Sequence, residues 1–301
     1  MPDSRVVVPA ISSTLCWIFA AVLFRQWLSR RRPYQIVWAI GLVWYALAAG
    51  ADAVGNLAGW SSALYRTWYY CGAICAAAWL GLGEVYLFRT SAFGELVAVS
   101  VFAGAIPAMI RGGALLATQA SAGADSGAAQ LAITVGLIAI ASAGVLALVG
   151  WERPYLLGHV ALGMLVAASA AALIQVIAAP LDLAQMLDPA TGIPHGAGFP
   201  ETVRLLTPPL NIAGALAIFF GAGYSAWQVF RRRGSAERLL SNALIAAGAL
   251  AISQASALNR FGTTDVFYLG ELLGVVLIFA GFLASTEIIS RRFLVPRAAH
   301  T

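Results

Sequence analysis

The chain consists largely of apolar runs of roughly 20 residues, separated by short polar turns. Such a run spans the hydrocarbon core of a bilayer as a helix, because backbone groups in hydrocarbon need partners within their own segment. The runs are continuous in alanine, leucine, isoleucine and valine, whereas the strands of a membrane barrel alternate apolar and polar residues. We therefore predict an all-α membrane protein, a polytopic bundle of transmembrane helices.

The composition leaves no room for a sizeable soluble domain. Hydrophobic residues make up 60% of the 301 residues and charged residues only 10%, against roughly 45–50% and about 25% in soluble domains. The mean hydropathy over the whole chain is +0.82. We expect residues 1–301 to form a single integral membrane domain, a multi-pass protein of a cell membrane such as the bacterial inner membrane.

Hydropathy predicts nine transmembrane spans. Pro107 and Arg111 interrupt the fourth of them, which makes it the least regular. The predicted spans cover residues 6–28, 35–59, 66–88, 94–117, 131–150, 156–180, 207–230, 238–258 and 267–290.

The arginines orient these spans. With the N-terminus outside and the C-terminus inside, thirteen of the eighteen arginines fall on the inner side, as the positive-inside rule requires. This placement in short loops is typical of membrane orientation and not of nucleic-acid binding, so no nucleic acid is expected as a partner. The bilayer is the expected environment, and the arginine-rich cytoplasmic face offers a docking surface for a partner protein.

Several chemistries are excluded or unsupported. Every basic residue is arginine, and retinal, pyridoxal phosphate and P-loop chemistry all need a lysine. Cys71 and Cys75 share a helix face, but no methionine or histidine completes a copper site. No paired buried histidines for haem and no hydrolase motif occur. We expect no cofactor, no metal and no enzymatic activity.

Two long loops fall on the predicted outer side, at residues 118–130 and 182–206. The first is rich in small polar residues, and the second contains three prolines. We expect both to be solvated connectors. The alternative for the second is a lid over an outward-facing cavity.

An ungapped offset of 203 residues aligns the two ends of the chain. It pairs Asn56 with Asn259 and Glu84 with Glu287. The units would be residues 6–90 and 207–293, so that helices 1–3 correspond to helices 7–9 in a parallel three-helix repeat. The alternative is chance similarity between two apolar segments.

Asp52 is the first candidate for a functional group. An ionisable residue at membrane depth costs roughly 2.5–3.5 kcal/mol and usually faces the bundle or a hydrated cavity. Asn56 follows one helical turn later on the same face. Gly55 and Gly59 have the spacing that lets another helix approach closely. Asp52 and Asn56 are thus either a solute or ion contact in an outer vestibule or an interhelical hydrogen-bond pair.

Three further carboxylates are candidates. Glu271 lies at a depth similar to that of Asp52, and the two could line one outer cavity; alternatively, Glu271 pairs with an outer arginine such as Arg66 or Arg260. Glu84 and Glu287 lie near the inner ends of their spans, where they would either form ion pairs with arginines or flank an inner gate.

The sequence favours a small-solute or ion transporter that uses these carboxylates in an outward-facing cavity. The candidate contacts are Asp52, Asn56, Glu271, Glu84 and Glu287. The alternative is a non-catalytic membrane sensor or accessory subunit that binds a ligand or a partner protein. A lipid-modifying enzyme is the third class considered, and no nucleophile, metal set or base in the sequence supports it.

Overall fold

A computed structural model describes residues 4–122, 127–189 and 191–231 of the chain. In the C-terminal part it describes residues 240–241, 243–245, 247–248, 251 and 267–285. The described residues form helices and turns, together with one isolated bridge between Leu187 and Pro194.

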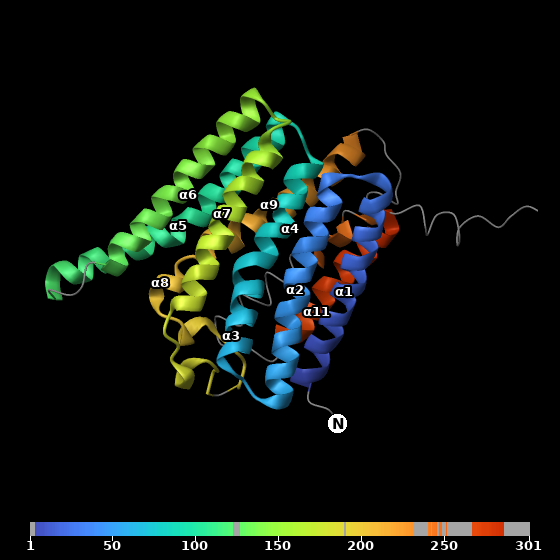
Figure 1. Cartoon of the computed structure of the whole chain (residues 1–301). Coiled ribbons are helices and arrows are strands. Elements are labelled where there is room, and N and C mark those ends of the chain that lie inside the picture. The colour runs from blue at the N-terminus through green and yellow to red at the C-terminus, as the bar shows by residue number, and fades with distance from the viewer. Residues whose placement is uncertain are drawn as a thin grey trace, which may run out of the picture. The chain divides into compact units, whose positions relative to one another are not determined.

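The described helices are labelled along the chain in Figure 1. They are α1 (Ser4–Arg30), α2 (Pro33–Ala58), α3 (Ser62–Trp68), η1 (Tyr69–Ala76), α4 (Ala77–Leu87), α5 (Ser91–Ala122), α6 (Gly127–Glu152), α7 (Leu157–Ala178), η2 (Leu183–Gln185), η3 (Gly196–Gly198), α8 (Glu201–Arg204), α9 (Thr207–Arg231) and α11 (Phe267–Ser285).

The described residues contain seven helices long and apolar enough to cross a membrane. They coincide with the first seven predicted spans, so the all-α membrane bundle is confirmed. The third of these spans is continuous from Ser62 to Leu87 and combines α3, η1 and α4. Helix α11 falls within the ninth predicted span, and most of the eighth lies outside the described residues. The count of nine and the orientation remain predictions.

The interruption expected in the fourth span is wrong. Helix α5 runs without a break from Ser91 to Ala122 and contains Pro107. A proline is tolerated inside a membrane helix because neighbouring groups and small local adjustments satisfy the backbone that it frees. Arg111, one turn later, forms an ion pair with Glu201 on α8.

The chain divides into two compact units, Met1–Ile218 and Phe219–Thr301. In the first unit α1 packs along α2, and α5 packs along α6. Figure 1 shows α6 and α7 diverging from the turn that joins them. Helix α9 crosses the boundary between the two units, and α11 lies wholly in the second unit. Within the second unit, Ser241 donates a 2.6 Å hydrogen bond to the Gly281 carbonyl.

Within the second predicted loop, the described residues 182–189 and 191–206 are folded and do not form a solvated connector. The buried apolar side chains of this loop include Met186, Ile193, Phe199 and Val203. The Phe199 ring stacks on Tyr65 at 5.2 Å and lies 4.7 Å from Tyr69. The Tyr65 hydroxyl donates to the His195 carbonyl. The solvated connector expected here is therefore wrong for the described residues, because aromatic contacts with α3 and η1 hold them in place.

Candidate functional site

Asp52 and Asn56 lie on one face of α2, as predicted. Asp52 is only 3% exposed, and its Oδ1 accepts a 2.7 Å hydrogen bond from Nδ2 of Asn56. The same Nδ2 lies 3.0 Å from the carbonyl oxygen of Arg5 on α1. Asn56 therefore links the buried carboxylate to the neighbouring helix, and the interhelical hydrogen bond that the sequence left as an alternative is present.

The close-packing interpretation of Gly55 and Gly59 is wrong. A Cβ at Gly55 would lie 2.5 Å from the ring of Trp60, so the space beside Gly55 is filled by the chain's own next turn. Gly59 has a φ of +94°, and a Cβ there would meet nothing within 4 Å. Gly59 ends α2 in a backbone conformation that L side chains rarely adopt. Spacing alone cannot distinguish such a turn from a helix contact.

Glu84 is buried near the end of α4, with only 6% of its surface exposed. Among the residues that the structure describes, its carboxylate forms no ion pair and no hydrogen bond. The adjacent Gly83 packs against Trp38, whose Nε1 donates a 3.1 Å hydrogen bond to the Leu80 carbonyl. The ion pair expected at the inner rim is therefore not observed for Glu84.

The remaining candidates lie elsewhere. Glu271 is half-buried on α11, in the second unit. Glu287 and Asn259 are outside the described residues, so the repeat stays a prediction, as does an outer cavity shared by Asp52 and Glu271. Arg66, proposed as a partner of Glu271, donates to the carbonyls of Val176 and Ala179 at the end of α7.

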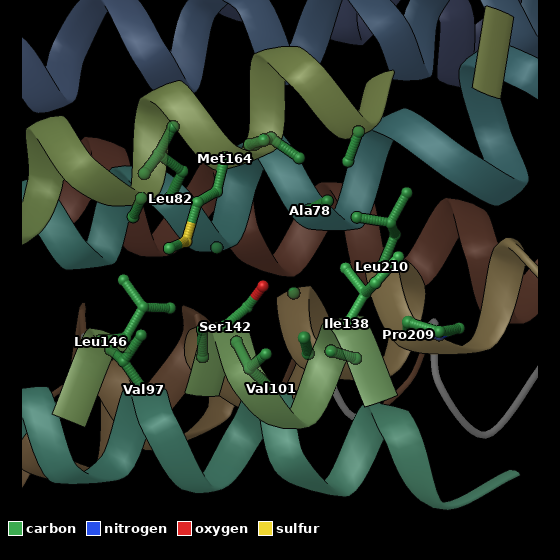
Figure 2. A pocket seen from close by; sticks show the side chains of 18 of the residues that line it. Ala78, Leu82, Val97, Val101, Ile138, Ser142, Leu146, Met164, Pro209 and Leu210 are labelled. Carbon is green, nitrogen blue, oxygen red and sulfur yellow. The ribbon is translucent and has the colours of Figure 1, made fainter. Parts of the chain in front are cut away.

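A cavity of about 310 Å³ lies inside the first unit, among α4, α5, α6, α7 and α9 (Figure 2). Its lining is almost entirely aliphatic and contains no charged side chain. The lining residues are Ala78, Gly81, Leu82, Val85, Val97, Val101, Val135, Ile138, Ala139, Ser142, Leu146, Ala161, Met164, Leu165, Ala168, Ala171, Leu206, Pro209, Leu210, Ala213, Gly214 and Ala217.

Helices that line this cavity approach one another closely at two places where glycines lie. At the first, α4 meets α9: a Cβ on Gly214 would lie 2.2 Å from the Ala77 carbonyl oxygen. At the second, α5 meets α6: a Cβ on Gly94 would lie 2.8 Å from Cα of Gly150. Small residues let the backbones touch at these points, and α6 and α7 diverge beyond the second crossing (Figure 1).

The exposed residues of the cavity lining come from α6 and α7. Ile138 on α6 and Ala171 on α7 are the exposed members of the lining, and every other lining residue is buried or half-buried. Both helices are transmembrane by length and composition. These exposed residues therefore face the surroundings of the bundle at membrane depth, where hydrocarbon chains are the local solvent.

Ser142 is the one polar side chain in the lining. Figure 2 shows its hydroxyl directed into the cavity, opposite Met164 and Leu82. Its hydroxyl makes no hydrogen bond with any other residue that the structure describes. The cavity thus combines a wide apolar lining with a single group that can donate and accept a hydrogen bond.

A polar network behind the cavity fixes the helices that form it. Ser169 on α7 accepts from Tyr70 at its carbonyl (3.1 Å) and from Trp79 at its hydroxyl (3.3 Å). Asn211 on α9 donates a 3.2 Å hydrogen bond to the Ala73 carbonyl in η1, a π-helix. These bonds tie α7 and α9 to the third span, which agrees with the interhelical role expected of membrane amides.

Asp52, Asn56 and Glu84, the described candidates of the first unit, are not among the residues that line this cavity. The sequence signal that could have indicated it is the density of alanine and glycine in α4, α7 and α9. That signal does not say which helices are neighbours. Within the described residues no group of three metal-ligating side chains occurs, and Cys71 and Cys75 are free and buried.

No protein family, curated protein or solved structure matches the chain. The fold itself places the protein in a class: it is an integral membrane protein, a multi-pass helical bundle.

Proposed function

We propose that the protein is a non-catalytic membrane protein that binds a small apolar molecule taken from the bilayer, as a sensor or accessory subunit does. The cavity among α4, α5, α6, α7 and α9, with its exposed lining residues on α6 and α7, is the observation that supports this proposal. Ligand sites are typically apolar hollows with a few placed polar groups. Here the polar group is Ser142.

The occupant is a single hydrocarbon chain carrying one hydroxyl or carbonyl group. A lining without charge gives no compensation to an ion removed from water, so ions and charged solutes are disfavoured. The volume of about 310 Å³ is about twice that of the cavity of roughly 150 Å³ that takes up benzene in an engineered protein. The Ser142 hydroxyl matches one polar group on the occupant.

Photolabelling tests the proposal. The protein in proteoliposomes is illuminated with a diazirine-bearing hexadecanol, and labelled peptides are identified by mass spectrometry. We expect labelling of cavity residues on α6 and α7, including Ser142 and Ala168, that saturates and is displaced by unlabelled hexadecanol. Labelling confined to exposed residues such as Leu137 and Ile174 (53% and 68% exposed), without saturation, would contradict the proposal.

Transport of a small solute, favoured by the sequence, is the second candidate. The observation in its favour is Asp52, which is buried at membrane depth and held by Asn56. Uptake by proteoliposomes carrying wild-type protein or the Asp52→Asn variant tests this function. Transport predicts solute-dependent flux that the substitution abolishes, whereas flux unaffected by the substitution argues against it.

A further inference from the structure

The turn between α1 and α2 carries three consecutive arginines, Arg30, Arg31 and Arg32. Helix α1 ends at Arg30 and α2 begins at Pro33. Arg31 has a φ of +52°, which reverses the chain within two residues. Its guanidinium turns back along α1 and lies 4.8 Å from the centre of the Trp27 ring. The tight turn therefore separates Arg31 from the other two arginines.

Arg30 and Arg32 line a hollow of about 550 Å³ together with Tyr34 and Leu87. No carboxylate contributes to its lining. Neither guanidinium forms an ion pair with any residue in the described part of the chain. Two arginines and one tyrosine thus line a space large enough for a ligand.

The start of α2 adds positive potential to the same hollow. Arg32 is the N-cap residue, no side chain caps the helix, and its first turn contains no acidic residue. The N-terminal end of a helix carries a partial positive charge that favours anions. Leu87, 37% exposed at the end of α4, provides an apolar wall beside the charged groups.

We propose that this hollow binds the phosphate group of an anionic phospholipid in the leaflet that the arginine distribution predicts to be cytoplasmic. Arginine recognises phosphate by paired hydrogen bonds, and basic pockets between membrane helices on that side bind anionic headgroups. The site is separate from the apolar cavity and does not depend on the function proposed for it.

Native mass spectrometry of the full chain in non-ionic detergent tests the site. The probes are dihexanoyl phosphatidylglycerol, dihexanoyl phosphatidylcholine and inorganic phosphate. We expect saturable binding of the phosphatidylglycerol, weakened by salt because the contact is electrostatic. The Arg30→Gln/Arg32→Gln variant should bind it about tenfold or more weakly, since each arginine near a charged headgroup contributes about a factor of five.

Two further variants make the result specific. Arg153→Gln/Arg231→Gln removes the same charge from exposed positions outside the hollow, and wild-type affinity is expected. Arg30→Lys/Arg32→Lys keeps the charge and should bind the lipid more tightly than Arg30→Gln/Arg32→Gln does. Retained binding in the lysine variant also shows that substitution at these two positions does not unfold the protein.

Three results would overturn the proposal. The first is unchanged affinity in Arg30→Gln/Arg32→Gln. The second is an equal loss in both glutamine variants, which would indicate diffuse attraction. The third is inorganic phosphate binding as tightly as the lipid, which would assign the hollow to a free phosphate.

Discussion

Asn56 donates a 2.7 Å hydrogen bond to the carboxylate of Asp52, one turn earlier on α2. The same amide nitrogen reaches the carbonyl oxygen of Arg5 on α1 at 3.0 Å. Asn56 therefore solvates a buried acid and joins two helices. Hydrogen bonds inside membrane bundles contribute on average about 0.6 kcal/mol, and up to about 2 kcal/mol.

Asn56→Ala is expected to destabilise the protein by about 1–2 kcal/mol, because both bonds are lost together. The thermal midpoint in detergent, measured by size-exclusion chromatography after heating, reports the change. Val54→Ala is the matched control, since Val54 is 48% exposed on the same turn of α2. Equal midpoints for the two variants would mean that the Asn56 bonds do not contribute to stability.

Gly214→Ala should disrupt the crossing of α4 and α9. The new Cβ would lie 2.2 Å from the Ala77 carbonyl oxygen, and backbone on both sides cannot move aside easily. We expect a loss of several kcal/mol, or of folded protein altogether, as in overpacked cores. Gly223→Ala, on the same helix but with nothing within 4 Å of its Cβ, should leave the thermal midpoint unchanged or slightly raised.

Glu84→Gln is expected to preserve or raise stability. The side chain is 6% exposed, and among described residues its carboxylate has no ion pair or hydrogen bond. Glutamine keeps the shape and removes the group whose burial in charged form is costly. The thermal midpoint of Glu84→Gln is compared with that of Glu95→Gln, a substitution at an exposed position. A clear loss for Glu84→Gln alone would show that the carboxylate has a structural or gating role.

Ser142→Ala should weaken binding of hexadecanol and leave binding of hexadecane unchanged. The hydroxyl is the polar group of the cavity lining, and one hydrogen bond contributes about 1 kcal/mol, or about fivefold in affinity. Equilibrium binding of radiolabelled hexadecanol and hexadecane to purified wild type and Ser142→Ala gives the change in affinity for each probe. A fall of equal size for both probes would instead indicate a change in the shape of the cavity.

Most of the helical framework could be predicted because the bilayer fixes both the length and the polarity of a span. The second predicted span, 35–59, is found at Pro33–Ala58, and the seventh, 207–230, at Thr207–Arg231. Local chemistry also placed Asp52 and Asn56 on one face of α2, since residues four apart on a helix are neighbours.

The features that depend on tertiary contacts were not predictable in the same way. Pro107 suggested a break that the surrounding structure does not make. The π-helix Tyr69–Ala76 has no hydropathy signal. The helices around the cavity meet closely at Gly214 and Gly94, and spacing along one helix does not reveal which residue lies opposite. A carboxylate within an apolar span is recognisable from the sequence alone. An aliphatic residue that lines a cavity has the same sequence signature as one that packs in the core.

The central claim is that the cavity among α4, α5, α6, α7 and α9 takes up one apolar molecule. Ala168 lines the cavity, whereas the preceding residue, Ala167, does not line it and is exposed on α7. The direct test is the number of radiolabelled hexadecanol molecules bound per chain by wild type, Ala168→Phe and Ala167→Phe. We predict one site in wild type and Ala167→Phe and none in Ala168→Phe, because the phenylalanine fills the space. Equal binding by all three proteins would contradict the account.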